Sequence, residues 1–239
     1  MMLSIIIPVY NEEKTIADVI KAVHAVELSG IQKEIIIVND GSTDGTENEV
    51  KKTLPTYKDV QFLIHKTNRG KGAAVRTGIE KATGEYILIQ DADLEYNPQD
   101  ITKLLQPITQ NSSVSVVYGT RLKRLPNFAR DERTYRFFIQ YLGNKFLSFV
   151  TSILYGQWIT DMETCYKIFP KKAIDGISLR SRGFDFEPEI TAKLLKKGYK
   201  IEEVPISTNP RGYDQGKKLH PIKDGTIALW SLFKFRFVN

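Results

Sequence analysis

Short apolar segments of strand length alternate with segments of helical periodicity through the first half of this chain. The strand-like segments are residues 3–8, 34–38, 60–64, 86–89 and 114–118. Strands that alternate with helices form parallel sheets with right-handed crossovers, because each helix packs back against the strands beside it. The alternation predicts an α/β fold with a mostly parallel central sheet flanked by helices. No internal repeat or flexible linker interrupts the pattern, so we expect one continuous domain with a C-terminal elaboration.

Three helix-like segments separate these strands, at residues 15–26, 46–52 and 72–82. In the first of them, apolar residues recur at helical spacing from Ile16 to Val23. Asn97 followed by Pro98 is typical of an N-cap and a first helical position. We therefore expect a further helix from there to about Gln106.

The composition excludes several classes of protein. With 239 residues, 41% of them hydrophobic, the chain can bury a core, which excludes disordered and fibrous proteins. Its single cysteine, Cys165, cannot form an internal disulfide and indicates a reducing compartment. No apolar stretch approaches the roughly 18 residues that span a bilayer, and residues 1–9 lack the basic region of a secretory signal. The net charge of +6 is compatible with nucleic acid, anionic lipid or phosphorylated substrates as partners.

Polar clusters follow three of the predicted strands directly. They are residues 8–12, 39–42 and 90–93. In open α/β sheets ligands bind beyond the carboxyl ends of the strands, where parallel strands bring such clusters together. One cluster alone would be explained by a turn that caps the next helix. Three clusters at three strand ends favour a binding site.

Two carboxylates, Asp91 and Asp93, stand at alternate positions after the predicted strand at residues 86–89. Paired oxygen ligands of this kind suit Mg²⁺ or Mn²⁺, which keep open positions for water and phosphate oxygens. Glu95 could supply a third oxygen. An Asp-x-Asp triplet by itself is common in acidic loops. The place of this one directly after a buried strand favours a metal site.

A glycine-flanked basic turn at residues 68–74 leads into a predicted helix. Backbone N–H groups at a helix start, with Arg69 and Lys71 beside them, favour a diphosphate or its metal complex. The turn lacks the spacing of a Walker loop, and the chain contains no G-x-G-x-x-G fingerprint. A helix start with a solvated lysine is the alternative.

These motifs, in this order, resemble those of family 2 glycosyltransferases with the GT-A fold. The matching segments are residues 4–13, 38–46, 68–72, 91–95, 119–121, 161–167, 183–189 and 203–206. The later segments narrow the resemblance to the dolichyl-phosphate or polyprenyl-phosphate mannosyl- and glucosyltransferases. It covers roughly residues 3–220.

The resemblance implies a Rossmann-like GT-A fold and a metal-dependent site for a GDP- or UDP-hexose. The nucleotide-sugar-binding residues would be Pro8, Tyr10, Asn11, Glu12, Val38, Asp40, Lys71, Asp91, Ala92, Asp93, Arg121, Arg211 and Lys217. The metal, Mg²⁺ or Mn²⁺, would be bound by Asp91, Asp93 and Glu95, where many relatives have glutamine in place of Glu95. Catalytic roles would fall to Asp161, Arg121 and Asp93, and the phosphate of a lipid acceptor would contact Arg121 and Arg136.

A basic, glycine-containing loop at residues 210–218 carries two of these positions, Arg211 and Lys217. The resemblance implies that this segment closes over the diphosphate. Its glycines and fixed positive charges are also what a phosphate clamp needs. A solvated surface loop is the alternative.

The acceptor class decides the expected mechanism. A polyprenyl phosphate is already anionic at neutral pH, so it can attack the anomeric carbon without a general base. We then expect inversion, with a β-linked product from an α-linked donor. Asp161 would be the natural base if the acceptor were a sugar hydroxyl, and with a phosphate acceptor it would position a neighbouring group. A structural cap after Thr160 is the alternative for Asp161.

Two apolar stretches suggest contact with a membrane surface. Residues 135–155 form a broad helical face with arginines upstream, and residues 227–238 interleave aromatic residues with Lys234 and Arg236. Both patterns are typical of helices in a bilayer interface, although either stretch could pack as ordinary core. We expect a catalytic domain at residues 1–220, including an interface helix at about 134–155, and an amphipathic tail at 221–239. The predicted location is the cytoplasmic face of a membrane, with a small membrane-protein subunit as a further candidate partner.

Three other functions are weighed against this one. A related soluble family 2 transferase would act on a saccharide hydroxyl. A nucleic-acid or membrane-binding module would explain the charge alone, but the basic residues are scattered among acidic motifs and no nucleic-acid-binding signature is present, so we expect no nucleic acid partner. A nicotinamide dehydrogenase is disfavoured by the missing glycine fingerprint. The three histidines, His24, His65 and His220, lack the spacing of a metal site and are expected to be structural or exposed.

Overall fold

The computed structural model describes residues 1–57, 59–122, 135–211 and 220–238. For residues 135 and 136 it describes the backbone only. Lys217 and the side chain of Arg136, two of the predicted site positions, therefore lie outside the described residues. The basic loop at 210–218 is described only for its first two residues.

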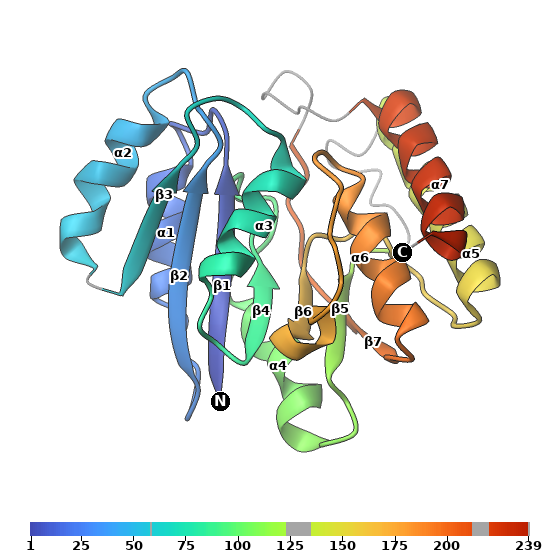
Figure 1. Ribbon diagram of the computed structural model, residues 1–239. Helices are drawn as coiled ribbons and strands as arrows, with labels where there is room; N and C mark the ends of the chain where they lie inside the picture. The colour runs from blue at the N-terminus through green and yellow to red at the C-terminus, as the bar shows by residue number, and fades with distance from the viewer. Residues whose placement is uncertain (58, 123–134, 212–219, 239) are drawn as a thin grey trace.

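Seven strands form one central sheet in the order β3-β2-β1-β4-β6-β5-β7 (Figure 1). Their bounds are β1 Met2–Val9, β2 Gln32–Asn39, β3 Val60–Ile64, β4 Tyr86–Ile89, β5 Val116–Thr120, β6 Lys167–Pro170 and β7 Ile201–Pro205. All neighbouring pairs are parallel except those of β6, which runs antiparallel to β4 and β5. The predicted α/β fold with a mostly parallel sheet is confirmed.

Helices cover both faces of this sheet. Their bounds are α1 Ile16–His24, α2 Thr46–Thr53, α3 Lys71–Lys81, α4 Asp100–Gln110, α5 Tyr135–Tyr155, α6 Phe186–Lys196 and α7 Pro221–Phe237. Successive residues of a strand point to opposite faces, so Ile5 and Ile7 pack in the core under α1 and α4, while Ile6 packs in the core under α3 and α6. Strands buried on both faces are continuous apolar runs, which is why β1 and β2 were readable from the sequence.

The predicted boundaries differ from the structure by more than two residues only at α4, among the elements predicted at residues 3–118. Helix α4 begins at Asp100, because Asn97 accepts the N–H of Gln99 on its side chain and that of Asp100 on its carbonyl, which makes a turn ahead of the helix. The helix also continues through Pro107 to Gln110, since its buried apolar residues pack on the sheet on both sides of the proline. Strand β5 begins at Val116, two residues later than predicted.

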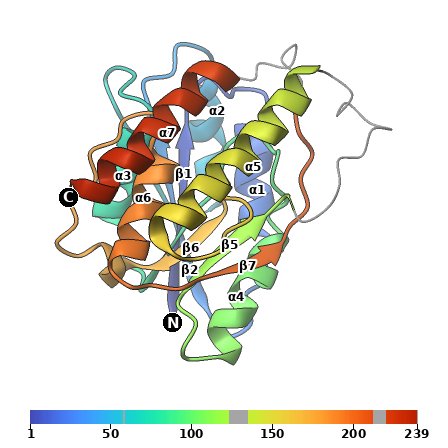
Figure 2. The ribbon, with the colours of Figure 1, turned by 90° about the vertical axis from the view of Figure 1, so that its right-hand side faces the viewer.

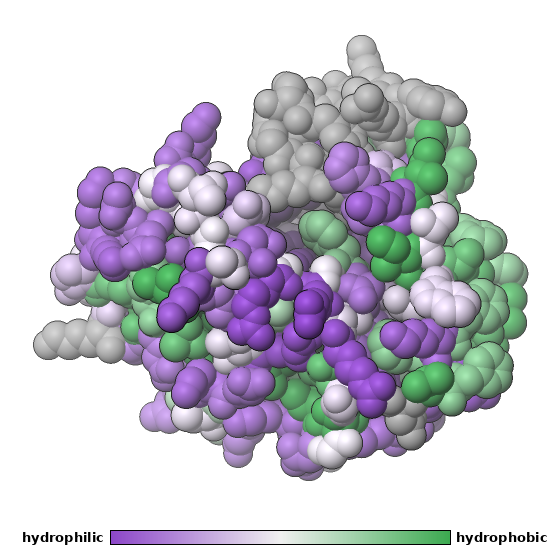
Figure 3. Space-filling view, turned by 45° about the horizontal axis from the view of Figure 1, so that its top comes forward, coloured by the Kyte–Doolittle hydropathy of each residue, from purple (hydrophilic) through white to green (hydrophobic). Residues whose placement is uncertain are grey.

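The C-terminal helix α7 lies beside α5 (Figure 2), and the hydroxyl of Tyr155 donates to the carbonyl of Leu232 at 2.7 Å. Ala228, Leu232 and Phe235 of α7 are buried in the core. This part of the helix therefore packs as ordinary core, which was the alternative to contact with a membrane. The outer faces of both helices carry exposed apolar side chains: Phe138, Leu142, Phe146, Phe149 and Ile153 of α5, and Ile222, Ile227, Trp230, Phe233 and Phe237 of α7. We call this set the α5/α7 patch; it forms the green right-hand edge of Figure 3. Among the described residues, no helix is long and apolar enough to cross a membrane.

Candidate functional site

A cavity of about 400 Å³ opens at the carboxyl ends of the parallel strands. The three predicted polar clusters all contribute to its lining: Pro8, Tyr10 and Glu12 after β1, Asp40 after β2, and Asp91, Ala92 and Asp93 after β4. Its volume is in the range of pockets that bind small ligands. The structure thus brings the three strand ends together as the sequence predicted.

Two predicted nucleotide-binding residues do not line this cavity. Asn11, in a left-handed conformation with φ of 50°, joins the loop after β1 to the loop after β2. Its N–H donates to the Ser42 hydroxyl at 3.0 Å, and its side-chain oxygen accepts the N–H of Thr43 at 2.8 Å. Val38 is fully buried in the core that lies under α3. The side chain of Val38 is therefore out of reach of a ligand in the cavity, which corrects its prediction, and the predicted contact of Asn11 with the nucleotide stays a prediction.

Asp40 lines the cavity and holds the loop that precedes α3. Its carboxylate accepts the N–H of Arg69 at 3.0 Å and that of Gly70 at 2.7 Å, and it bonds Nδ1 of the buried His65 at 2.6 Å. Gly70 has φ of 92°, and a Cβ there would lie 2.2 Å from the carbonyl oxygen of Arg182, so only glycine fits. His65 also bonds the Thr77 hydroxyl at 2.9 Å and is a structural residue, as predicted.

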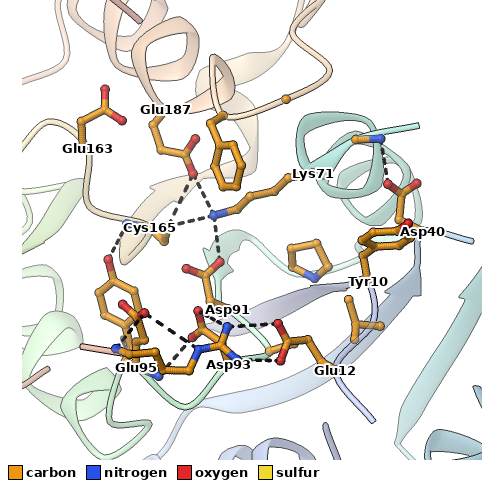
Figure 4. Close-up of a pocket in the computed structure, with 18 of the residues that line it drawn as sticks. Tyr10, Glu12, Asp40, Lys71, Asp91, Asp93, Glu95, Glu163, Cys165 and Glu187 are labelled. Carbon is orange, nitrogen blue, oxygen red and sulfur yellow. Dashed lines mark hydrogen bonds and ion pairs between the residues drawn. The ribbon is translucent and has the colours of Figure 1, made fainter. Parts of the chain in front are cut away.

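Lys71, the first residue of α3, lies at the centre of a buried cluster. Its Nζ is 2.8 Å from Oδ1 of Asp91, 3.0 Å from Oε1 of Glu187 and 2.8 Å from Sγ of Cys165 (Figure 4). Burial opposes the charge of Lys71, but attraction by the carboxylates of Asp91 and Glu187 raises its pKa well above the usual value. Burial and the charge of Asp91 raise the pKa of Cys165, so the cysteine is a neutral thiol that accepts from Lys71 and donates to Oε1 of Glu187 at 3.5 Å. The alternative of a solvated lysine is wrong.

Arg211 occupies the opposite side of the cavity. Its guanidinium donates to both carboxylate oxygens of Glu12, at 2.9 and 3.0 Å, and to Oδ2 of Asp93 at 3.2 Å. Its backbone N–H donates to Oε1 of Glu95 at 3.1 Å. The start of the basic loop is thereby tied to the strand ends, and the alternative of a solvated surface position is wrong for Arg211.

Acidic side chains outnumber basic ones in the cavity. Among the described residues, seven carboxylates line it against three cations: Glu12, Asp40, Asp91, Asp93, Glu95, Glu163 and Glu187 against Lys71, Arg121 and Arg211. Burial and the nearby carboxylates of Asp91 and Glu95 raise the pKa of Asp93 to about 7. A ligand that carries only negative charge would be repelled here, whereas an anion that brings a divalent cation would be attracted.

The predicted metal ligands are close in sequence but do not converge on one point. Among the described residues, no three His, Cys, Asp or Glu side chains are gathered as a metal site. The reason is that Lys71 engages Asp91 while Arg211 engages Asp93 and Glu95. The donor chemistry nevertheless fits a hard divalent cation, because all the available ligands are carboxylate oxygens whose charge is incompletely neutralised.

Asp161 does not line the cavity and is fully buried. Its Oδ2 accepts the backbone N–H and the Nε of Arg121 at 2.9 and 2.8 Å, and its Oδ1 accepts Nη2 at 2.8 Å. Glu203 in turn accepts the N–H groups of Thr160 and Asp161. Asp161 therefore fixes Arg121, which does line the cavity, and its prediction as a catalytic residue is corrected to a positioning residue.

Several lining residues were not singled out from the sequence. They are Asn68, Gly70, Tyr96, Gln140, Asn144, Glu163, Cys165, Phe184 and Glu187, with Val9 and Gly183. Glu163, Cys165, Phe184 and Glu187 belong to the segments 161–167 and 183–189, which the sequence flagged as motifs without assigning roles within them. Gln140 and Asn144 lie on α5, for which the sequence pattern predicted only an apolar face.

The sequence is similar to those of known glycosyltransferases. A family model described as glycosyl transferase family 2 matches residues 4–177. Glycosyltransferase AglJ of Haloferax volcanii is 30% identical over 231 residues, which cover 96% of this chain and 70% of that protein. The UDP-N-acetylglucosamine–dolichyl-phosphate N-acetylglucosaminyltransferase of Methanococcus voltae is 34% identical over 224 residues, which cover 87% of this chain and 85% of that protein.

A solved structure with the same fold is that of glucosyl-3-phosphoglycerate synthase from Mycobacterium tuberculosis, in complex with Mn²⁺, uridine diphosphate and phosphoglyceric acid. It aligns with a TM-score of 0.73 over 100% of this chain and 79% of that chain, at 16% sequence identity. A second structure of the same synthase contains Mg²⁺ and uridine diphosphate and aligns with a TM-score of 0.69 and 15% identity over 100% of this chain and 80% of that chain. These similarities show the GT-A fold.

Proposed function

This chain belongs to glycosyltransferase family 2, and from that premise we propose that it transfers a hexose, mannose or glucose, from a GDP- or UDP-sugar to a polyprenyl phosphate. The observation that carries the proposal is the convergence of Lys71, Asp91, Asp93 and Arg211 in one acidic cavity at the strand ends. The relative from Methanococcus voltae, which is named for dolichyl phosphate, supports the acceptor class.

The donor would bind as a metal complex of its diphosphate. Asp91 and Asp93, with Glu95 in reach, would hold Mg²⁺ or Mn²⁺, which supplies neutralisation of the charge that develops on the leaving nucleoside diphosphate. Lys71 and Arg211 would add charged hydrogen bonds to phosphate oxygens once those oxygens replace their present carboxylate partners. Pro8, Tyr10 and Ala92 line the remaining wall, where the nucleoside would lie.

The position of Asp161 supports a phosphate acceptor. Because Asp161 is buried and accepts three hydrogen bonds from Arg121, it offers no free carboxylate to deprotonate a sugar hydroxyl. A phosphate acceptor needs no base, and Arg121 would bind its charge from the cavity wall. Arg136, on the first turn of α5, stays a prediction for the same role.

Helix α5 links the cavity to the α5/α7 patch. Gln140 and Asn144 line the cavity, whereas Phe138, Leu142 and Phe146 on the same helix are exposed. A lipid phosphate could therefore reach the cavity while its chain stays in the membrane leaflet that the patch contacts. We propose peripheral binding to a membrane on this basis; the cytoplasmic face and a small membrane-protein subunit stay predictions.

The transfer is tested with labelled UDP-glucose and GDP-mannose, Mg²⁺, and a polyprenyl phosphate dispersed in detergent. We expect the label of one donor to move into the organic phase as a β-linked lipid phosphosugar, identified by its anomeric NMR signal. The matched control is the corresponding polyprenol, which lacks the phosphate and should accept nothing. An α-linked product, or equal transfer to the polyprenol, would contradict the proposal.

Membrane binding is tested with the double variant Phe149→Ser/Trp230→Ser. We expect its binding to anionic vesicles, measured by flotation, to weaken by at least about tenfold, because each exposed side chain that enters the interface contributes on the order of 1.5 kcal/mol. Ile64→Ser is the control, since Ile64 is 46% exposed on β3, far from the patch. Equal flotation of the double variant and the wild type would show that the patch does not bind lipid.

A further inference from the structure

Two carboxylates at one end of the cavity each carry an oxygen without a hydrogen-bond partner among the described residues. They are Oε1 of Glu163 and Oε2 of Glu187, and both residues line the cavity. Glu187 is only 2% exposed, and its other oxygen contacts Lys71 and Cys165. Buried polar atoms are nearly always satisfied in folded proteins, so two unpaired oxygens on residues that line one cavity point to a hydrogen-bonding occupant at this end of it.

Within the described part of the chain, the fold pairs one oxygen of Glu187 with Lys71 but leaves the other oxygen of Glu187 and Oε1 of Glu163 unpaired. Burial, together with the charge of Glu187, raises the pKa of Glu163 to about 8. The two carboxyl groups are therefore not both readily ionised at neutral pH. Lys167, the nearest buried cation of β6, donates its hydrogen bonds to the carbonyls of Met162 and Thr164 instead. Burying an unsatisfied carboxylate destabilises a protein, which an apolar residue at either position would avoid.

The position of the pair along the cavity identifies what it would bind. Figure 4 shows Glu163 and Glu187 at one end, Glu12 and Asp93 at the other, and Lys71 with Asp91 between them. If the diphosphate lies against Asp91, Asp93 and Arg211, the group joined to its terminal phosphate extends towards this pair. That group is the sugar that is transferred.

We propose that Glu163 and Glu187 form the subsite that binds hydroxyl groups of the transferred sugar. The inference rests on the proposed function and adds the residues that recognise the sugar. A carboxylate oxygen accepts the hydrogen bond of a hydroxyl, and two neighbouring carboxylates can engage two hydroxyls of one ring. Phe184 lines the same end, with Nζ of Lys71 5.9 Å from its ring centroid, and offers an apolar surface to the C–H face of a hexose.

The subsite has a consequence for specificity. A site built to bind a hydroxyl rejects a sugar that lacks it, because the buried oxygen is then left unpaired. An N-acetyl group in place of a hydroxyl keeps one donor, its amide N–H, but adds a carbonyl oxygen that a carboxylate oxygen repels and a methyl group that neither glutamate can bind through a hydrogen bond. We therefore expect an unsubstituted hexose to be bound in preference to an N-acetylhexosamine.

The test compares binding of the free nucleotides GDP and UDP with binding of GDP-mannose, UDP-glucose and UDP-N-acetylglucosamine, all with Mg²⁺, by calorimetry. In Glu163→Gln and Glu187→Gln we expect the better-bound hexose donor to lose about 10- to 100-fold in affinity, the cost of leaving one sugar hydroxyl without its buried acceptor. In Glu163→Gln the affinity for the free nucleoside diphosphate should change less than threefold, which a general structural defect would not allow; Glu187→Gln also removes a partner of Lys71 and is expected to change it. Glu47→Gln, on the exposed face of α2, is the matched control.

The outcomes separate this inference from the proposed function. If neither GDP nor UDP binds to the wild type, the proposed function fails. If a nucleotide binds but the hexose donor binds equally well to the wild type and to a folded Glu163→Gln, the subsite is wrong. Glu163→Gln decides the matter if Glu187→Gln does not fold, because Glu163 contributes no ion pair among the described residues. Tighter binding of UDP-N-acetylglucosamine than of both hexose donors would also overturn the subsite.

Discussion

Replacing Asp93 with asparagine is expected to reduce hexose transfer by at least about 100-fold at saturating Mg²⁺ or Mn²⁺. Asparagine keeps the size of the side chain and removes the charge that would bind the cation, an interaction that supplies several kcal/mol to the departing diphosphate. Asp93 bonds the N–H of Glu95 and a guanidinium nitrogen of Arg211, which also keeps both bonds to Glu12. The free energy of unfolding in EDTA should therefore stay within about 1 kcal/mol of the wild type.

Initial rates with each metal check this expectation, and urea unfolding in EDTA checks the fold. Asp18→Asn is the matched control, because Asp18 lies on α1 with its carboxylate paired only to exposed Lys21 among the described residues. The wild type should lose activity in EDTA and regain it when Mg²⁺ or Mn²⁺ is added. Transfer by Asp93→Asn within threefold of the wild type would show that this carboxylate holds no metal.

The second large effect is expected on stability. Replacing Asp161 with alanine should lower the free energy of unfolding by about 3–5 kcal/mol, because it leaves the guanidinium of Arg121, whose side chain is only 20% exposed, without its fully buried counter-charge. The backbone N–H of Arg121 loses its acceptor as well. Urea denaturation followed by circular dichroism measures the change. Asp161→Asn, which keeps an oxygen to accept one of these bonds, should fall between alanine and the wild type.

A double-mutant cycle with Arg121→Ala isolates the pair. We expect the double variant to be less destabilised than the sum of the single variants, since removing both charges leaves none uncompensated. A loss below about 1 kcal/mol for Asp161→Ala would mean that the arginine does not depend on the carboxylate. The pH dependence of the rate supplies an independent check. If Asp161 only positions Arg121, the pH–rate profile of Asp161→Asn keeps the shape of the wild-type profile. If Asp161 is a general base, its replacement removes the acidic limb of the profile.

The parallel half of the sheet could be predicted because its strands are continuous apolar segments in the sequence. Residues 5–7 and 35–38 are unbroken apolar runs, as strands buried on both faces must be. Strand β6 is different: it is four residues long and begins with a lysine, which looks polar in sequence. Lys167 is nevertheless buried, because its ammonium group finds the carbonyls of Met162 and Thr164. That compensation is tertiary and has no local signal.

The same distinction applies to the site. Asp91 and Asp93 were predictable, since a pair of carboxylates after a buried strand points to the sheet edge. The pairing of Asp161 with Arg121, 40 positions apart, was not, and the sequence therefore assigned both to catalysis. Val38 matched a motif position, but a motif does not separate a residue that touches the ligand from one that is buried in the core.

The most direct test of the account is a competition between the two classes of acceptor. The purified protein is incubated with its labelled donor, Mg²⁺, and equal concentrations of a polyprenyl phosphate and of a mixture of free oligosaccharides. We expect the label to appear on the lipid phosphate and the oligosaccharides to stay unlabelled. Label on the oligosaccharides alone would contradict it, and would mean that a group other than the buried Asp161 deprotonates a sugar hydroxyl in this site.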